Sequence, residues 1–199
     1  MPEAPQQTDS PDIDLKDPIV AALLAWLVPG LGHWYQGRRA KAVLFFICIM
    51  GLFAYGVYLG GGTRVDKDNQ SRYLGYGRAV YLSLQKDDLR LYYLSQIGVG
   101  LPAMPALVQA YRMNHHQKVF LDGFMAPPRS VQVRFDDPNE GQPTAHDLNY
   151  LLNRTFELAT IFTAVAGLLN VLAVCDAFGG PVAMQPAAKK EEKEEEEPA

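Results

Sequence analysis

Four long segments without a charged residue constrain the fold of this chain more than any other feature. They are residues 18–37, 42–63, 91–111 and 158–175, with 20, 22, 21 and 18 residues. A helix needs about 20 mainly apolar residues to cross roughly 30 Å of hydrocarbon, whereas helices of a soluble domain expose a charged face. We therefore predict an all-α integral membrane protein with four transmembrane helices.

The four segments differ in how well they suit a continuous helix. Residues 42–60 read AVLFFICIMGLFAYGVYLG and form the strongest predicted span, and residues 158–175 are nearly as apolar. The segment 91–111 contains Pro102 and Pro105. Because proline inside a helix removes a backbone hydrogen bond, we expect the third span to be kinked or broken near its middle.

The first segment ends in an aromatic and basic turn, PGLGHWYQGRRAK, over residues 29–41. Tryptophan and tyrosine favour the membrane interface, and cations next to them reach the lipid phosphates. We predict a tight helical hairpin over residues 18–63 with this turn at the membrane surface. The residues of the turn are Pro29, Gly30, Gly32, His33, Trp34, Tyr35, Gly37, Arg38 and Arg39.

This hairpin resembles the TM2 domain, in which a turn of the form G-x-G-H-x-Y-x-G-R joins two membrane helices. The matching residues are Gly30, Gly32, His33, Tyr35, Gly37 and Arg38. The later stretches IGVGLPAMPALVQA and AGLLNVLAVCDAFGGP are similar to an uncharacterised family of multi-pass bacterial membrane proteins. The resemblance implies a four-helix protein of the bacterial inner membrane and brings no established activity.

The segments outside the spans are polar. We expect an acidic, disordered tail at each end, residues 1–17 and 179–199. The 64–90 loop is expected to hold a short interfacial helix from about residue 78 to residue 91. The Pro- and Gly-rich loop at residues 112–143 contains SVQVRF, whose alternation predicts one short strand.

The last span is predicted to begin outside the membrane. Thr144 and Asp147 have the spacing of a capping box, in which each side chain bonds the backbone of the other residue. Apolar residues then recur at helical spacing up to Phe178, where Gly179, Gly180 and a proline stop the helix. We therefore expect one long helix over residues 144–178.

The positive charges conflict on the orientation of the protein in the membrane. The short first turn carries Arg38, Arg39 and Lys41, which places this turn in the cytoplasm and both tails outside. The 64–90 loop carries six cations, which favours the reverse. Because short loops and the first helix weigh most, we expect both tails outside.

Several residues inside the predicted spans are candidates for specific contacts. Small residues at the spacing Ala159, Thr163 and Gly167 allow close helix packing. Polar residues in a span face partners or cavities, and we favour hydrogen bonds between helices over a substrate path for them. They are Gln96, Gln109 and Asn170. For Asp176, we favour an interfacial site bonded to the glycine backbone that follows over a buried acid.

The sequence gives little basis for catalysis or metal binding. Cys48 and Cys175 lie in apolar runs without metal or redox spacing, and we expect both to be buried packing residues. His115 and His116 are adjacent, so on a helix they would point about 100° apart. The motifs G-x-S-x-G and H-E-x-x-H and a P-loop are absent from the sequence. We predict no catalytic residues, no metal and no cofactor.

Our leading functional hypothesis is a non-enzymatic scaffold or subunit of a membrane complex. Its partners would be the lipid bilayer and another membrane protein or a second copy of itself, and the acidic tails argue against nucleic acid. The alternative is a small transporter or channel component that uses the kinked third helix, and a weaker one is a lipid-acting membrane enzyme. A pore predicts polar residues on one face of several helices, and an enzyme predicts clustered acids or histidines. The sequence shows neither pattern.

Overall fold

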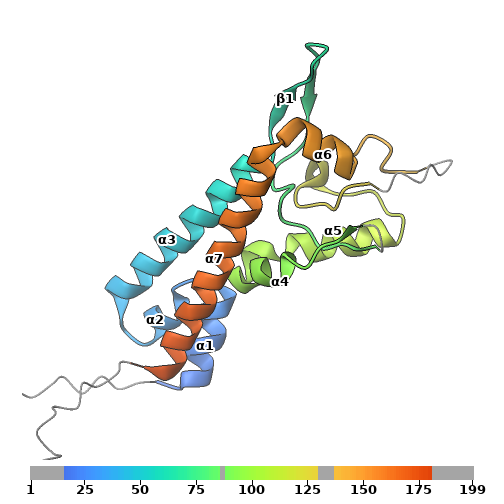
Figure 1. The fold of residues 1–199 in the computed structure, drawn as a ribbon. Coiled ribbons are helices and arrows are strands. Elements are labelled where there is room, and N and C mark those ends of the chain that lie inside the picture. The colour runs from blue at the N-terminus through green and yellow to red at the C-terminus, as the bar shows by residue number, and fades with distance from the viewer. Residues whose placement is uncertain (1–15, 86–87, 130–136, 181–199) are drawn as a thin grey trace, which may run out of the picture.

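The computed structural model describes residues 16–85, 88–129 and 137–180 and is mostly helical (Figure 1). The α-helices in this part of the chain are α1 (Pro18–Leu27), α2 (Leu31–Tyr35), α3 (Arg39–Leu59), α4 (Tyr93–Gln96), α5 (Pro105–Asn114), α6 (Ala145–Leu152) and α7 (Arg154–Gly179). Two short antiparallel pairs accompany them: β1 (Thr63–Val65) with β2 (Ser71–Tyr73), and β3 (Leu84–Gln85) with β4 (Asp88–Leu89).

Two of the helices, α3 and α7, are long and apolar enough to cross a membrane, which indicates membrane association. They lie side by side in opposite directions, and most of the surface of each is exposed (Figure 1). Gly56 permits their close approach, since a Cβ there would lie 2.6 Å from Thr163 Cγ2 and 3.0 Å from the Ala159 carbonyl oxygen. The second and fourth predicted spans thus form the longest helices of the fold.

The first predicted span is not one helix of spanning length. α1 has 10 residues, about 15 Å, which is half the thickness of the hydrocarbon core. Gly30 then adopts a φ of 84°, a left-handed conformation that glycine reaches without a Cβ clash, and α2 turns back along α1. Lys16 Nζ lies 5.0 Å from the centre of the Tyr35 ring, so this α1–α2 hairpin begins and ends at the same end of the bundle.

The third predicted span is also broken, near its middle as its prolines predict. α4 is followed by two 3₁₀ turns, Ile97–Val99 and Leu101–Ala103, and then by α5. Between the turns, Gly100 has a φ of 85° and a ψ of −133°, a conformation incompatible with a helix. α5 extends away from α7 at a steep angle instead of running along α3 and α7 (Figure 1). The segment is therefore not a single transmembrane helix.

Beyond the far ends of α3 and α7, the loops fold into an ordered cap, which comprises the described residues within 60–92 and 115–153. Arg78 is buried in it and donates hydrogen bonds to the carbonyl oxygens of Leu74 and Asp122 and to Gln142 Oε1. Burial lowers the pKa of Arg78 to about 10. At neutral pH this guanidinium is still charged and ties three loops together.

The expected interfacial helix over residues 78–91 is wrong. The described part of that segment contains turns and the β3–β4 pair. Arg90 is buried, donates to Thr160 Oγ1 at 2.7 Å and lies 4.2 Å from the Tyr81 ring centre. These contacts place its charge inside the cap, whereas an interfacial helix would expose it to solvent.

The prediction of a capping box at Thr144 and Asp147 is confirmed, but the single helix expected after it is wrong. Asn153 has a φ of 47° and a ψ of −129° and separates α6 from α7. Asparagine is one of the few residues that adopts a positive φ readily. The predicted SVQVRF strand and both predicted tails lie almost wholly outside the described residues.

Candidate functional site

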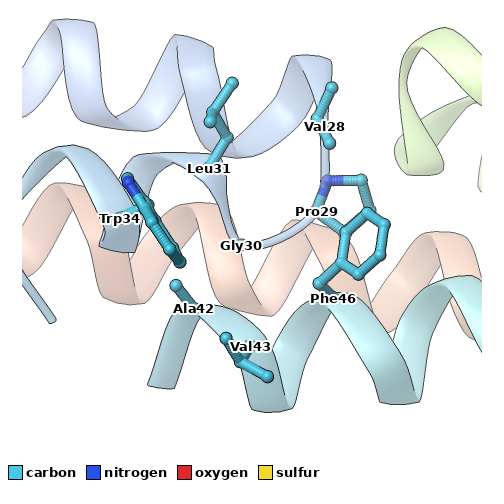
Figure 2. Close-up of a pocket in the computed structure, with 8 residues that line it drawn as sticks. All are labelled: Val28, Pro29, Gly30, Leu31, Trp34, Ala42, Val43 and Phe46. Carbon is cyan, nitrogen blue, oxygen red and sulfur yellow. The ribbon is translucent and has the colours of Figure 1, made fainter. Parts of the chain in front are cut away.

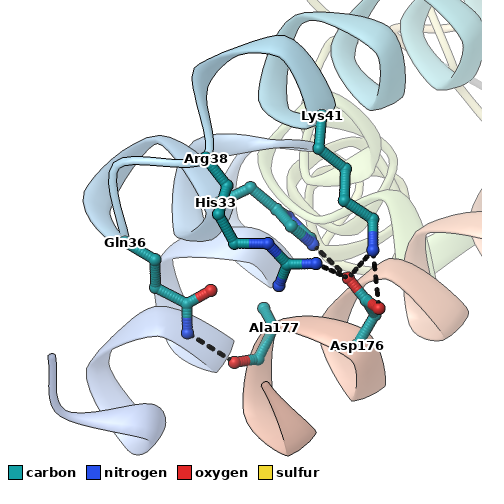
Figure 3. A network of polar contacts seen from close by, with 6 residues as sticks. All are labelled: His33, Gln36, Arg38, Lys41, Asp176 and Ala177. Atoms are coloured by element: carbon teal, nitrogen blue, oxygen red, sulfur yellow. Dashed lines mark hydrogen bonds and ion pairs between the residues drawn. The ribbon is translucent and has the colours of Figure 1, made fainter. Parts of the chain in front are cut away.

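Four charged or titratable side chains meet at the end of the bundle where the α1–α2 hairpin packs against α7 (Figure 3). Asp176, near the end of α7, accepts a hydrogen bond from His33 Nε2 on α2 at 2.7 Å. Arg38 Nη2 lies 3.3 Å and Lys41 Nζ lies 2.6 Å from the same oxygen, Asp176 Oδ2. Both cations come from the start of α3. The cluster therefore joins three helices through one carboxylate.

The burial of His33 indicates its ionisation state. Its side chain is fully buried, and Nδ1 has no hydrogen-bond partner within the described residues. A protonated ring would bury an N–H donor without an acceptor, which costs more than an unpaired lone pair. We therefore assign a neutral imidazole with its proton on Nε2. One negative and two positive charges then remain in the cluster.

The end of α7 receives a second contact from the hairpin. Gln36 Nε2 donates a hydrogen bond to the Ala177 carbonyl oxygen at 2.7 Å, and so satisfies one of the carbonyls that a helix C-terminus leaves unpaired. The expectation that Asp176 bonds the glycine backbone after it is wrong. The α1–α2 hairpin covers this helix end, and Asp176 instead pairs with His33 of the hairpin and with two cations from the start of α3.

Five of the six residues that resemble the TM2 turn have a structural role at this turn. Gly30 and Gly37 have φ values of 84° and 80°, which a side chain would strain. Gly32 packs so closely on α1 that a Cβ would overlap the carbonyl oxygen of an α1 alanine. His33 and Arg38 both bond Asp176. The spacing of this motif therefore fits a chain reversal whose side chains bond to α7.

An apolar pocket lies beside the cluster, between the hairpin and α3 (Figure 2). Its volume is about 240 Å³. It is lined by Val28, Pro29, Gly30, Leu31, Trp34, Ala42, Val43 and Phe46, and we call it the hairpin groove. Trp34 is 53% exposed at one end of it, and the guanidinium carbon of Arg39 lies 5.8 Å from the centre of the indole ring. Pro29 and Phe46 form the opposite end of the groove in Figure 2.

Two of the predicted intramembrane polar residues are fully buried where broken segments meet α7. Asn170 Nδ2 donates to the carbonyl oxygens of Ala25, at 3.2 Å, and Gly98, at 2.9 Å. Gln96 Nε2 donates to Thr163 Oγ1 at 2.8 Å. Helix ends leave backbone carbonyls without partners, which is costly away from water. Asn170 supplies such a donor to the last turn of α1.

The third of them, Gln109, is buried elsewhere. Its Nε2 donates to the carbonyl oxygens of Phe120 and Phe124 at 2.8 and 2.9 Å, so it holds a loop of the cap on α5. The predicted packing residues Ala159, Thr163 and Gly167 are all buried. Ala159 and Thr163 face α3, whereas Gly167 faces α4. Residue 167 must be a glycine for α4 to pack this closely, since a Cβ there would overlap the Ser95 carbonyl oxygen.

The cluster is better suited to holding α2, α3 and α7 together than to transferring a proton. A carboxylate paired with two cations is a weak base, because losing its charge would leave those cations unpaired. Among the described residues, no group of three or more His, Cys, Asp or Glu side chains could hold a metal ion. Cys48 and Cys175 are exposed on α3 and α7, so the expectation that they are buried was wrong.

Comparison with known proteins gives a family without an assigned role. No curated protein and no solved structure matches the chain. A family described as one of unknown function, DUF6677, matches residues 20–190, which is most of the sequence. The chain therefore belongs to the DUF6677 family.

Proposed function

We propose that this protein is a non-enzymatic, multi-pass protein of the cell membrane that acts as a scaffold or subunit of a membrane complex. In this proposal α3 and α7 cross the bilayer, and the α1–α2 hairpin enters and leaves at one face. The cap lies at the opposite face. Its ordered surface is then the part of the molecule available to another protein or to a second copy of this chain.

The side chains along α3 support a position across the membrane. Trp34 and Arg39 lie at its first end, and Tyr55 and Tyr58 are exposed near its last turn. Aromatic belts of this kind mark the two interfaces of a bilayer. From Arg39 to Tyr58 the helix rises about 28 Å, close to the roughly 30 Å of hydrocarbon. Exposed apolar side chains such as Ile47, 62% exposed, lie between the two belts.

The use of the buried amides is the observation that carries the scaffold proposal. Gln36, Gln96, Gln109 and Asn170 all donate to main-chain carbonyl oxygens. Each bond ties two separate segments of the chain together. A polar interior used in this way supports a rigid frame for the cap.

One observation favours a transporter or channel component as the second candidate. Broken segments meet beside Asn170, and discontinuous membrane helices form the substrate sites of many transporters. The junction is tightly packed, however. A Cβ on Gly100 would overlap the Trp26 carbonyl oxygen. This close packing makes the scaffold the better-supported function.

Extraction and photo-cross-linking in native membranes test this proposal. A photoreactive residue replaces Val65 or Tyr150 on the cap, 62% and 42% exposed, and Leu172 on α7, 65% exposed, serves as the control. We expect discrete protein adducts from the two cap positions and lipid adducts from Leu172. Release of the protein by alkaline carbonate would overturn the membrane assignment. Ion flux through liposomes containing the purified protein, abolished by Asn170→Leu, would establish the transporter instead.

A further inference from the structure

The hairpin groove has the shape and chemistry of a site for a single alkyl chain. All of its lining residues are apolar, and it opens outward between the α1–α2 hairpin and α3 (Figure 2). Its volume of about 240 Å³ lies below the roughly 300–1,000 Å³ of pockets that hold drug-sized ligands. Val43 and Phe46 are 45% and 47% exposed along it. One flexible chain fits such a groove better than a bulky ring.

The end of the groove at Trp34 is positively charged. Arg39 is exposed there, and its guanidinium lies over the Trp34 ring that also lines the groove. The ion pairs found in the described residues give Arg38 and Lys41 a carboxylate, Asp176, and give none to Arg39. The apolar groove therefore ends at an exposed cation.

The start of α3 adds to this excess of positive charge. Arg39 and Lys41 lie in its first turn, with Arg38 at the N-cap and no acidic residue in that turn. The N-terminus of a helix itself carries partial positive charge and is stabilised by anions, so cations there are unfavourable unless an anion offsets them. Asp176 offsets part of this charge. The remainder is complementary to a phosphate.

We propose that the hairpin groove binds one anionic phospholipid of the surrounding bilayer, with an acyl chain in the groove and its phosphate at Arg39. This inference rests on the membrane position proposed above. The geometry matches the molecule: Arg39 and Phe46 are about 10 Å apart along α3, so the chain extends into the bilayer below its headgroup. Trp34, at the Arg39 end of the groove, then lies at the depth that indole prefers.

Native mass spectrometry of the full-length protein, purified in mild detergent, tests the site. The probe is an equimolar mixture of phosphatidylglycerol and phosphatidylcholine with identical acyl chains. We expect one retained phosphatidylglycerol per protein. Arg39→Gln should reduce the preference for it about five-fold, the effect of one cation at an anionic membrane surface. Arg39→Lys should restore the preference, and Arg154→Gln, a cation lost at the start of α7, should leave it unchanged.

Filling the groove gives a second, independent arm. Val43→Trp should abolish retention of both lipids, whereas Val165→Trp, an equal change at an exposed site on α7, should not. Equal retention of the two lipids by the wild type would overturn the proposal, as would unchanged retention by Val43→Trp. With either of these results the protein would still be found in the membrane fraction. Failure of the membrane position itself would instead appear as release by alkaline carbonate.

Discussion

His33 Nε2 donates a hydrogen bond of 2.7 Å to Asp176 Oδ2, although 143 residues separate the two in the chain. The bond closes the largest loop that any titratable pair of the cluster makes. It fixes the α1–α2 hairpin to the last turn of α7, where Arg38 and Lys41 reach the same carboxylate. The beginning and the end of the described chain are thus held together by a few polar atoms.

Asp176→Asn is expected to destabilise the protein in detergent. The substitution leaves the cations of Arg38 and Lys41 without their counter-charge, and hydrogen bonds to charged groups contribute about 1.5–3 kcal/mol each. Because Asp176 is 33% exposed, water compensates part of this loss, and we expect about 1–2 kcal/mol. Thermal unfolding measures the effect. Glu157→Gln, which removes an exposed acid from the other end of α7, should change the melting temperature little.

A double-mutant cycle isolates the His33–Asp176 bond. If the two side chains interact directly, His33→Ala and Asp176→Ala should be less than additive by about 0.5 kcal/mol or more in the free energy of unfolding. Full additivity would show that the two side chains stabilise the protein independently. That result would contradict a direct bond between the imidazole and the carboxylate.

Gly167→Leu is expected to disturb the protein more than Leu168→Ala. A side chain at Gly167 would overlap the Ser95 carbonyl oxygen and push α4 away from α7. Leu168 is 55% exposed, so its truncation removes few internal contacts. Yield and thermal stability in detergent compare the two variants. Equal values would mean that α4 does not pack on α7 at this position.

The Asp147 capping box predicts a pH dependence of stability. Burial raises the pKa of this carboxyl, but hydrogen bonds from Thr144 and the charge of Arg72 outweigh it, and the net pKa lies below 3.8. A depressed folded-state pKa stabilises the protein above the unfolded pKa and loses this effect as pH falls. The free energy of unfolding of the wild type should therefore exceed that of Asp147→Asn by about 1 kcal/mol near neutral pH.

Thermal melts of both proteins between neutral and acidic pH measure this difference. It should shrink as the pH falls below 3.8, the ordinary value for aspartate. A difference that stays constant down to the lowest accessible pH would show that the Asp147 charge contributes nothing to the cap. A difference that grows on acidification would mean that the pKa of Asp147 is raised by folding instead of lowered.

The reversal at Gly30 changes the expected topology. A first helix that crossed the bilayer would place Lys16 and Arg39 on opposite sides. In the membrane position proposed above, the α1–α2 hairpin would instead place both on one side and Lys67 on the other. Single cysteines at these three positions, after Cys48→Ser and Cys175→Ser, test this with an impermeant maleimide on intact cells. We expect positions 16 and 39 to react alike and position 67 to differ. Labelling that separates positions 16 and 39 would restore a spanning first helix.

Local sequence was sufficient to predict the features that depend on neighbouring residues. The Thr144–Asp147 capping box follows from a spacing of three residues, and the break near Gly100 follows from the two prolines that come within five residues after it. The apolar runs of α3 and α7 stand out because each helix buries little of its surface in the protein. The break at Asn153 was missed because apolar residues such as Leu152 and Phe156 keep helical spacing across it.

Tertiary contacts decided the rest, because charge and hydropathy report how apolar a segment is and not which way it turns. The first and third apolar runs are long enough to span, yet Gly30 and Gly100 reverse or break the backbone where a second segment packs against it. The partners of Asp176 lie 135 to 143 residues away, beyond any local pattern. The sequence by itself determined a mostly helical chain with two long apolar helices. Only the packing of distant segments determined how the first and third apolar runs turn and break, because backbone carbonyls freed by those breaks need donors that only folding brings near.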